Sequence, residues 1–312
     1  MKKRPKVHLY IRGNCGNQFF QYAFARYIQE KTDAELIINY SKARGKAIFK
    51  ESDNLLQDYE TVPYKYESNM GWGGFMFRLF KLFRYVFGLT SMKKRTYRFL
   101  LRCAKILPPL GIYYFDAAYY PFPIYKKKNI YVYGYFESPR YFEEIDEKIK
   151  KELTPRNAAL EQNKDLLDVI NNSESVCVTI KRRDITDPVY QYDISYFYRA
   201  IEYLKKELDN PVFVVFSDDV EWCRNNIKVD ANLMFETPNN PIWEKIRLMS
   251  SCKHFIIHNS TFSWWAQHLS KNKMKKVIAP SKWMQRDDQP IDIYEKGWIY
   301  LTPEGEFVEE HD

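Results

Sequence analysis

The sequence of 312 residues lacks several features that define specialised protein classes. Glycine and proline are scarce, at 11 and 15 residues, which excludes collagen-like and low-complexity chains. The five cysteines are scattered and form no Cys-x-x-Cys pair, so we expect neither a zinc site nor a disulfide scaffold. The longest uncharged run, His254 to Ser270, contains several polar residues and does not resemble a transmembrane helix. We therefore expect a cytoplasmic protein with a sizeable hydrophobic core.

Acidic residues are absent from Ser68 to Phe115, where nine lysines and arginines lie. The chain carries a net charge of +8, so this segment at +9 leaves −1 for the remainder. Between residues 95 and 105 the basic residues are spaced three, four and three apart, which predicts one basic helix face. Basic helices with aromatic-rich apolar faces are typical of proteins that dock on anionic membranes, and residues 74–105 fit this pattern.

An ordinary solvated helix face over a core explains the same basic segment equally well. Nucleic acid is a less favoured partner, because no nucleic-acid-binding module is visible in the sequence. The segment and the aromatic residues after it, together 68–125, form the least regular part of the chain.

The C-terminal half alternates short apolar runs with amphipathic ones, which predicts a parallel, doubly wound α/β sheet. The predicted strands are 175–180, 211–216, 232–235, 254–258 and 276–280, and the predicted helices are 196–208, 222–227, 242–252 and 261–269. The N-terminal half begins in the same way, with strands at 7–11 and 35–39 around a helix. We therefore predict two α/β domains facing a cleft, at 1–160 and 161–312, with a basic helical insertion in the first.

Polar residues cluster after several of the predicted strands, where ligands bind in parallel α/β sheets. The clusters are Gly13-Asn14-Cys15-Gly16-Asn17-Gln18, Lys181-Arg182-Arg183-Asp184, Ser217-Asp218-Asp219 and Asn259-Ser260-Thr261. Each alone is typical of a turn or a helix N-cap, but together they indicate one ligand-binding rim. No Asp-x-Asp and no GxxxxGK[ST] motif occurs, so neither a metal held by paired aspartates nor a P-loop is indicated.

These residue types suit a nucleoside diphosphate held by cations without a metal. Lys181 and Arg182 can hold a pyrophosphate, and the helix that follows residues 259–261 favours an anion at its N-terminus. Asp218 and Asp219 can accept hydrogen bonds from a base or a ribose, although Asp219 also fits the cap of the next helix. Gly13 and Gly16 permit close approach of the backbone to a ligand.

Three stretches resemble the alpha-1,2-fucosyltransferase family, glycosyltransferase family 11, as found in bacteria. They are IRGNCGNQFFQYAFARYIQEKT (11–32), VFSDDVEWCRNNI (215–227), and CKHFIIHNSTFSWWAQHLS with VIAPSKW (252–270 and 277–283). GYFESPRYFEEI (134–145) and CVTIKRRDI (177–185) match as well. Only residues 45–125 lack a counterpart.

The resemblance implies a GT-B architecture and an inverting, metal-independent transfer of L-fucose from GDP-fucose, with no cofactor. The C-terminal domain would bind the nucleotide sugar, and the N-terminal domain the acceptor. The acceptor would be a galactose 2-hydroxyl of a surface polysaccharide or a lipid-linked oligosaccharide. A peripheral position at the inner face of the cell membrane would suit residues 74–105.

The same resemblance suggests roles for individual residues. Lys181 and Arg182 would stabilise the departing diphosphate, and Asp184 is a candidate general base, or a structural partner of a neighbouring arginine. Asn17 and Gln18 would face the sugar or the acceptor. The remaining donor-binding candidates are Gly13, Gly16, Thr179, Ser217, Asp218, Asp219, Asn259, Ser260 and Thr261.

The chain departs from the family motif His-x-Arg-Arg-Gly-Asp at Thr179, Lys181 and Arg183. Lysine keeps the positive charge of the first arginine but loses its bidentate fork. Two alternatives follow: the same fold using another nucleotide-sugar donor, or a membrane-associated nucleotide-sugar binder without turnover.

Overall fold

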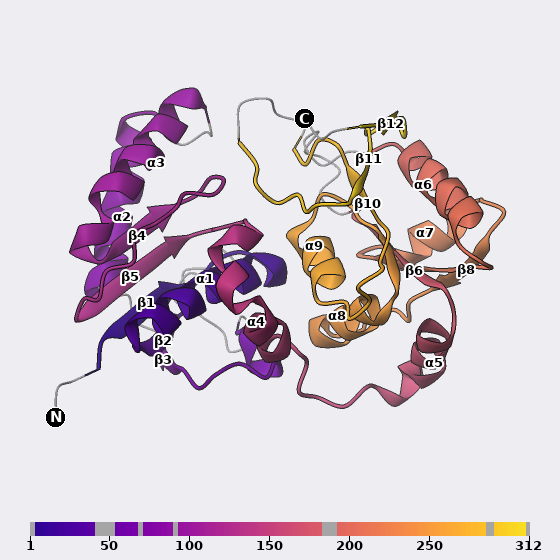
Figure 1. Ribbon diagram of the computed structural model, residues 1–312, viewed down its shortest axis with the longest axis horizontal. Helices are drawn as coiled ribbons and strands as arrows, with labels where there is room; N and C mark the ends of the chain where they lie inside the picture. Colours follow the sequence, from indigo (N-terminus) through magenta and orange to yellow (C-terminus); the bar gives the residue numbers. More distant parts are fainter. Residues whose placement is uncertain are drawn as a thin grey trace. The chain divides into compact units, whose positions relative to one another are not determined.

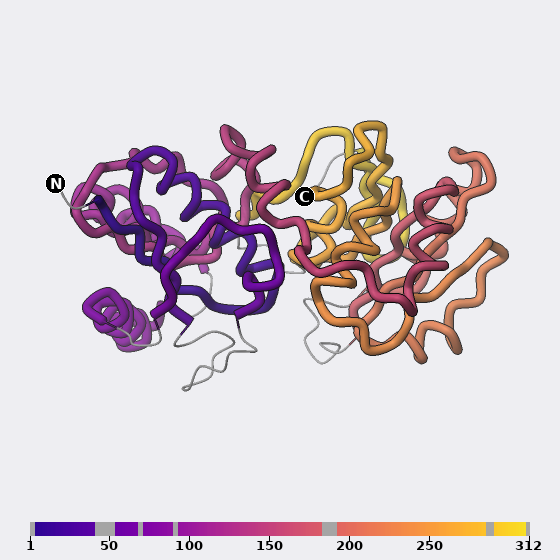
Figure 2. Tube along the Cα trace, turned by 90° about the horizontal axis from the view of Figure 1, so that it is seen from below, coloured from indigo at the N-terminus to yellow at the C-terminus, as the bar shows by residue number. Residues whose placement is uncertain are grey.

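The computed structural model describes residues 4–40, 54–67, 71–89, 93–182, 192–284 and 290–309. These residues form two units, the first ending at Leu153 and the second beginning at Thr154. The first unit also includes residues 290–293 from near the C-terminus. Apart from these residues, each unit is formed by one continuous part of the chain, as the colours of the trace in Figure 2 show. The division lies a few residues before the boundary predicted at 160.

The first unit is built on a parallel five-stranded sheet with the order β3-β2-β1-β5-β4. Its strands are β1 Lys6–Tyr10, β2 Glu35–Asn39, β3 Lys65–Glu67, β4 Ile112–Phe115 and β5 Asn129–Gly134. Its helices are α1 Cys15–Thr32, α2 Gly71–Val86, α3 Lys94–Ile106 and α4 Asp146–Glu152. Short 3-10 turns lie at Leu55–Asp58, Pro108–Leu110, Pro139–Tyr141 and Glu143–Ile145.

Helices α1 and α2 cover opposite faces of this sheet (Figure 1). Phe24 of α1 packs on Tyr113, whereas Phe77 of α2 stacks on Tyr114, the next residue of β4. Successive side chains of a strand point to opposite faces, so the two contacts place the helices on either side. Gly73 lets α2 approach closely, because an added Cβ would lie 2.5 Å from the hydroxyl of Tyr10.

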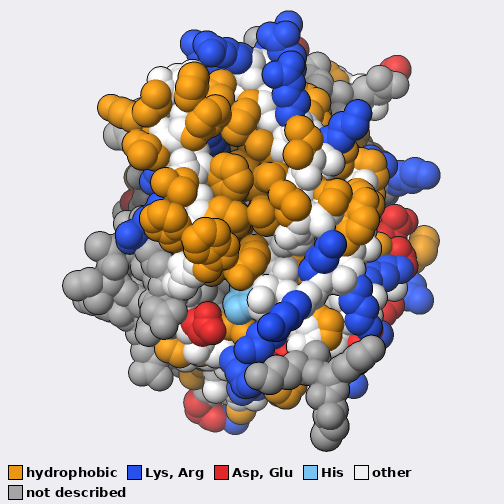
Figure 3. Space-filling view, turned by 90° about the vertical axis from the view of Figure 1, so that its left-hand side faces the viewer, with side chains coloured by type: hydrophobic (Ala, Val, Ile, Leu, Met, Phe, Trp, Pro, Cys, Tyr) orange, Lys and Arg blue, Asp and Glu red, His pale blue; other side chains and the backbone are white. Residues whose placement is uncertain are grey.

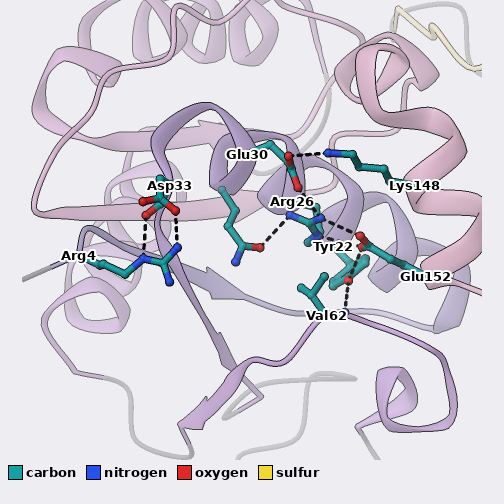
Figure 4. Close-up of polar contacts among 9 residues, drawn as sticks. Arg4, Tyr22, Arg26, Glu30, Asp33, Val62, Lys148 and Glu152 are labelled. Atoms are coloured by element: carbon teal, nitrogen blue, oxygen red, sulfur yellow. Dashed lines mark hydrogen bonds and ion pairs between the residues drawn. The ribbon is translucent and has the colours of Figure 1, made fainter.

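A buried ion pair ties α1 to α4 in the first unit (Figure 4). The guanidinium of Arg26 donates to both carboxylate oxygens of Glu152, at 2.7 and 2.9 Å. The hydroxyl of Tyr22 donates to the same carboxylate at 2.7 Å. At the rim of the pair, Glu30 accepts from Arg26 and from Lys148. The bidentate geometry and the third donor compensate for the desolvation of two buried charges.

The second unit has seven strands in the order β12-β11-β10-β9-β6-β7-β8, parallel except for β12. They are β6 Ser175–Ile180, β7 Val212–Ser217, β8 Asn232–Phe235, β9 His254–Ile256, β10 Val277–Pro280, β11 Ile299–Leu301 and β12 Phe307–Val308. The helices are α5 Lys164–Asn172, α6 Ile194–Glu207, α7 Val220–Asn226, α8 Ile242–Ser251 and α9 Thr261–His268, with a 3-10 turn at Glu161–Asn163.

The core of the second unit lies on both faces of its sheet. Alternate residues such as Val176 and Val178 of β6 pack with α6 and α7, while Cys177 between them contacts Cys252 at the end of α8. Helices α6 and α9 accordingly lie on opposite sides of the strands in Figure 1. Trp264 and Trp265 of α9 are fully buried in this core.

The predicted elements of the second unit agree with the structure to within a few residues, and 175–180 and 232–235 match β6 and β8 fully. The first unit contains three strands that the sequence analysis does not predict, namely β3, β4 and β5. Within the described residues, no helix has both the length and the apolar character needed to cross a membrane.

Replacing Glu152 by alanine should destabilise the protein by about 3 kcal/mol, because Arg26 would remain buried without its counter-charge. Urea unfolding followed by far-UV circular dichroism measures the change. The control is Glu147→Ala, which removes a carboxylate whose side chain is 91% exposed and should change stability by less than about 0.5 kcal/mol. Equal effects of the two substitutions would contradict the stabilising role of the buried pair.

Candidate functional site

The strand order of the second unit reverses between β6 and β9, and the predicted polar residues lie at this point. Counted along the chain, its first six strands follow the doubly wound order 3-2-1-4-5-6. In such sheets the connections leave the two central strands toward opposite faces, which opens a crevice beyond their carboxyl ends. Lys181 and Arg182 follow β6, and residues 258–261 follow β9. Residues 217–219 end the neighbouring strand β7 and begin the turn after it.

Arg182 is held at this edge by its backbone and its side chain. Its backbone N–H donates to the carboxylate of Asp218 at 2.7 Å, which connects the ends of β6 and β7. Its guanidinium lies 3.5 Å from the ring centroid of Trp222 in α7. Its Nε atom is buried and donates no hydrogen bond within the described part of the chain. The stacking therefore fixes the guanidinium while leaving a donor for a ligand.

The residues after β7 are engaged in the fold to different degrees. The carboxylate of Asp219 accepts from the backbone N–H of Trp222 and caps α7, as one of the two sequence interpretations proposes. The hydroxyl of Ser217 accepts from the N–H of Asp219. Asp218 holds the N–H of Arg182, so its carboxylate also organises the site.

A buried glutamate that the sequence analysis does not identify supports the same turn. Glu236, directly after β8, accepts from the N–H of Ser217 at 3.0 Å and from Nζ of Lys245 at 2.8 Å. Burial raises the pKa of Glu236, and Lys245 opposes that rise. No motif marks Glu236, because its role depends on the pairing of β7 with β8.

The turn after β9 presents the N-terminus of α9 to this edge. Thr179 of β6 is buried, and its hydroxyl accepts from the N–H of His258 at 3.0 Å, so it fastens β6 to the turn. The amide Nδ2 of Asn259 donates to the carbonyl of Trp283. The hydroxyl of Ser260 accepts from the N–H of Phe262 and caps α9. Thr261 is the first residue of α9, and the positive end of the helix dipole there favours an anion.

His258 is neutral in the folded protein. Its ring is buried, 4.8 Å from the ring of Tyr192 in edge-to-face contact, and its Nδ1 atom has no hydrogen-bond partner among the residues described. Desolvation, and secondarily the charge of Lys181, lower the pKa of His258 to about 3. His254 and His268 are also structural, since they contact Glu174 and Glu295 respectively.

The first unit has its own reversal of strand order, between β1 and β5, and a second polar cluster lies there. Arg12, just beyond β1, pairs with Asp116 directly after β4. The guanidinium of Arg12 also lies 3.9 Å from the ring centroid of Tyr135. Arg84 of α2 contributes a second cation to Asp116, at 3.1 Å. Arg84 is therefore part of this cluster and not of the solvated basic face expected for its segment.

Glu137 is a carboxylate beside this cluster that sequence reasoning alone does not identify. It follows β5 and is half-buried, and its side chain forms no hydrogen bond or ion pair within the described ranges. Burial raises the pKa of Glu137 to about 7; Arg12 opposes the rise and Asp116 adds to it. Its only indication in the sequence is its place in the GYFESPRYFEEI match.

The predicted glycine turn lies next to Arg12 and is closely packed. Gly13 has φ +79°, and an added Cβ would lie 2.8 Å from Nδ2 of Asn17. Gly16 and Asn17 belong to the first turn of α1. Gln18 is fully buried, and its amide donates to the carbonyl of Gly13 at 3.1 Å. Gln18 therefore stabilises the turn from inside the fold, whereas Asn17 is half-buried.

Two predicted residues, Arg183 and Asp184, lie outside the described residues. Within the described ranges, no group of three histidine, cysteine, aspartate or glutamate side chains is arranged to hold a metal. The five cysteines are buried thiols.

Comparison with known proteins decides the family. The model of glycosyl transferase family 11 matches residues 112–302, which is more than half of the chain. The chain belongs to glycosyl transferase family 11. Both the β6–β9 reversal and the Glu137 region fall inside the matched residues.

Two of the curated relatives of this family-11 chain come from Escherichia coli. An alpha-1,2-colitosyltransferase is 35% identical over 185 residues, which is 56% of this chain and 63% of the relative. An O-antigen biosynthesis glycosyltransferase, WbnK, is 32% identical over 160 residues, which is 45% of this chain and 52% of the relative. The chain thus aligns with about half to two thirds of the length of these relatives.

Solved structures establish the fold of the family-11 chain. The fucosyltransferase NodZ from Bradyrhizobium matches with a TM-score of 0.51 at 11% identity, over 86% of this chain and 94% of NodZ. A further NodZ structure was soaked with GDP-fucose. At this identity the match concerns the fold alone, and it agrees with two parallel-sheet units of the GT-B class.

The neutral state of His258 predicts how stability depends on pH. Above pH 6.5 the folded and unfolded states both hold a neutral imidazole, and below it only the unfolded state takes up a proton until the pH nears 3. This histidine should therefore lower the unfolding free energy by about 1 kcal/mol for each pH unit below 6.5. Urea unfolding at several pH values should give a shallower acid slope for His258→Phe than for the wild type. Parallel slopes would contradict the buried neutral histidine.

Proposed function

We propose that this chain transfers L-fucose from GDP-fucose to a hydroxyl of an oligosaccharide acceptor, with inversion and without a metal ion. The observation that carries the proposal is the cationic edge at the β6–β9 reversal, where Lys181 and Arg182 lie beside the turn that opens α9. Membership of family 11 and the GDP-fucose soaked into NodZ, which shares the fold, support the donor class.

The proposed step is a direct displacement at the anomeric carbon. The acceptor oxygen forms a bond to that carbon, and the bond to the diphosphate oxygen breaks with its electron pair. Lys181 and Arg182 stabilise the charge that grows on the departing diphosphate, and the positive end of the α9 dipole favours the same charge. Asp218 positions Arg182 by accepting a hydrogen bond from its backbone N–H.

The acceptor is proposed to bind in the first unit, at the cluster around Arg12, Asp116 and Glu137. A galactose 2-hydroxyl is the proposed nucleophile, and the O-antigen role of WbnK favours a surface-polysaccharide or lipid-linked acceptor. The carboxylate of Glu137 has no partner among the residues that the structure describes, and its raised pKa suits a general base at neutral pH. We therefore propose Glu137 as the general base in place of Asp184. A prediction below compares the two residues.

Arg182→Ala should lower kcat about 100- to 1000-fold, because one charge donor to the leaving group is lost. Arg182→Lys should recover only part of this loss, since lysine keeps the charge but not the planar contact with Trp222. The measurement is steady-state GDP release with donor and acceptor present. Arg199→Ala, at an exposed position of α6, is the control and should be unchanged. A fully active Arg182→Ala protein would overturn the assignment.

The second candidate donor is GDP-colitose, favoured by the 35% identity to a colitosyltransferase. Colitose is L-fucose without its 3-hydroxyl, so the two donors differ by one hydrogen-bonding group. A site that hydrogen-bonds this hydroxyl would reject colitose strongly, by up to about 10⁴-fold, whereas an apolar pocket discriminates only weakly. The ratio of kcat/KM for the two donors therefore distinguishes the candidates. Tight GDP binding with turnover of neither donor would favour the non-catalytic alternative.

Glu137→Gln should lower kcat about 100-fold or more and remove the acid limb of the pH profile. In the wild type, kcat/KM should fall as the pH drops through about 7, because Glu137 becomes protonated and cannot accept a proton. Asp184→Asn is the matched comparison and should keep the acid limb. A profile that loses its acid limb in Asp184→Asn but not in Glu137→Gln would assign the base to Asp184 instead.

A further inference from the structure

Helix α2 has two apolar faces, and the first unit covers only one of them. The covered face carries Gly73, Phe77 and Phe80, which pack on the aromatic side chains of β1, β4 and β5. A helix on the surface of a soluble domain normally exposes polar residues on the side opposite its packing face. Helix α2 instead exposes large apolar residues there.

The exposed face is a narrow stripe of large side chains. At 3.6 residues per turn its six members lie within about 100° of the helix circumference. They are between 43% and 68% exposed: Trp72, Phe75, Leu79, Leu82, Phe83 and Val86. Phe83 continues the stripe onto α3 by stacking on Phe99, with ring centroids 5.5 Å apart.

Basic side chains surround this apolar stripe. On α2, Arg78 borders the stripe and Lys81 lies further round the helix, and both are exposed. Helix α3 exposes four more: Arg95, Arg98, Arg102 and Lys105. Figure 3 shows the hydrophobic side chains gathered on one face of the first unit, with Lys and Arg along its margins. The basic face predicted for residues 95–105 is therefore present, and an ordinary solvated face over a core does not describe α2.

We propose that the stripe of α2, with its basic margin on α2 and α3, docks the protein on an anionic membrane surface. The aromatic and aliphatic side chains enter the boundary between headgroups and acyl chains, and the lysines and arginines contact lipid phosphates. Segment 68–115 contains no acidic residue, so the charge of the whole surface complements anionic lipid. The proposal follows from the geometry and charge of this surface, and it does not depend on which donor sugar the protein uses.

Self-association through the same stripe is disfavoured by charge. Two copies related by a two-fold axis would bring two basic margins together, and the segment has no carboxylate to pair with them. Nucleic acid would contact the basic residues but would leave Leu79, Leu82 and Val86 in water. A bilayer interface satisfies the apolar and the basic parts of the surface together.

Sedimentation with vesicles tests the proposal on the full-length protein. Binding should be strong to mixed phosphatidylglycerol and phosphatidylcholine vesicles, weak to phosphatidylcholine alone, and reduced by high salt. Leu79→Ser combined with Leu82→Ser should lower the partition coefficient at least about tenfold. Arg98→Gln combined with Arg102→Gln should lower it about fivefold for each charge removed.

The controls lie on the second unit. Met274 is 84% exposed, so Met274→Ser removes an apolar side chain of similar exposure outside the stripe. Lys271→Gln combined with Lys273→Gln removes two exposed charges outside the basic margin. Both controls should change vesicle binding by less than roughly twofold. Far-UV circular dichroism and urea unfolding check that every variant is folded, whatever donor the protein uses.

Any of four outcomes would overturn the proposal. The first is no preference for the anionic vesicles, and the second is equal binding of the leucine variants and the wild type. The third is a stable dimer in analytical ultracentrifugation that Leu79→Ser and Leu82→Ser dissociate, which would make the stripe an interface between copies. Binding that depends on the arginines alone, and equally to an oligonucleotide, would assign the surface to nucleic acid.

Discussion

The arrangement of the second unit depends on the reversal of strand order between β6 and β9. Because adjacent parallel strands there continue toward opposite faces, the backbone after each strand is free to turn toward a ligand. The hydrogen bond from the N–H of Arg182 to Asp218 fixes one side of this opening. The bond from the N–H of His258 to Thr179 fixes the other. These two contacts connect the end of β6 to the residues that follow β7 and β9.

Both units place an arginine on an aromatic ring beside their strand reversal. Arg182 lies over Trp222 in the second unit, and Arg12 lies over Tyr135 in the first. A guanidinium held by a ring face keeps its charge and its in-plane donors, so the stacking positions a cation without neutralising it. The two arginines differ in their charge environment, because Asp116 forms an ion pair with Arg12 inside the first unit. The first unit therefore suits neutral hydroxyl groups, and the second suits a diphosphate.

Much of the second unit follows from the sequence, because its strands are short apolar runs separated by helices of ordinary length. The first unit is less regular in sequence, since β4 and β5 are tyrosine-rich and β3 has only three residues. Aromatic residues fit a strand, a helix core or an exposed surface, so composition alone does not assign them. The same limit applies to Glu137 and Glu236, whose environments arise only from strand pairing. The residues of α2 suggest an apolar stripe, but the sequence alone does not show which face of the helix packs on the sheet. The contacts of Gly73 and Phe77 with the sheet decide this in the structure.

Release of GDP from GDP-fucose by the purified protein, with a galactoside acceptor and a chelator, tests the central claim most directly. The account predicts turnover that the chelator leaves unchanged, together with calorimetric binding of GDP, because cationic side chains and the start of α9 carry the diphosphate. Turnover of another guanine-linked sugar alone would replace the donor while keeping the site. Absence of binding to any guanine nucleotide would contradict the account.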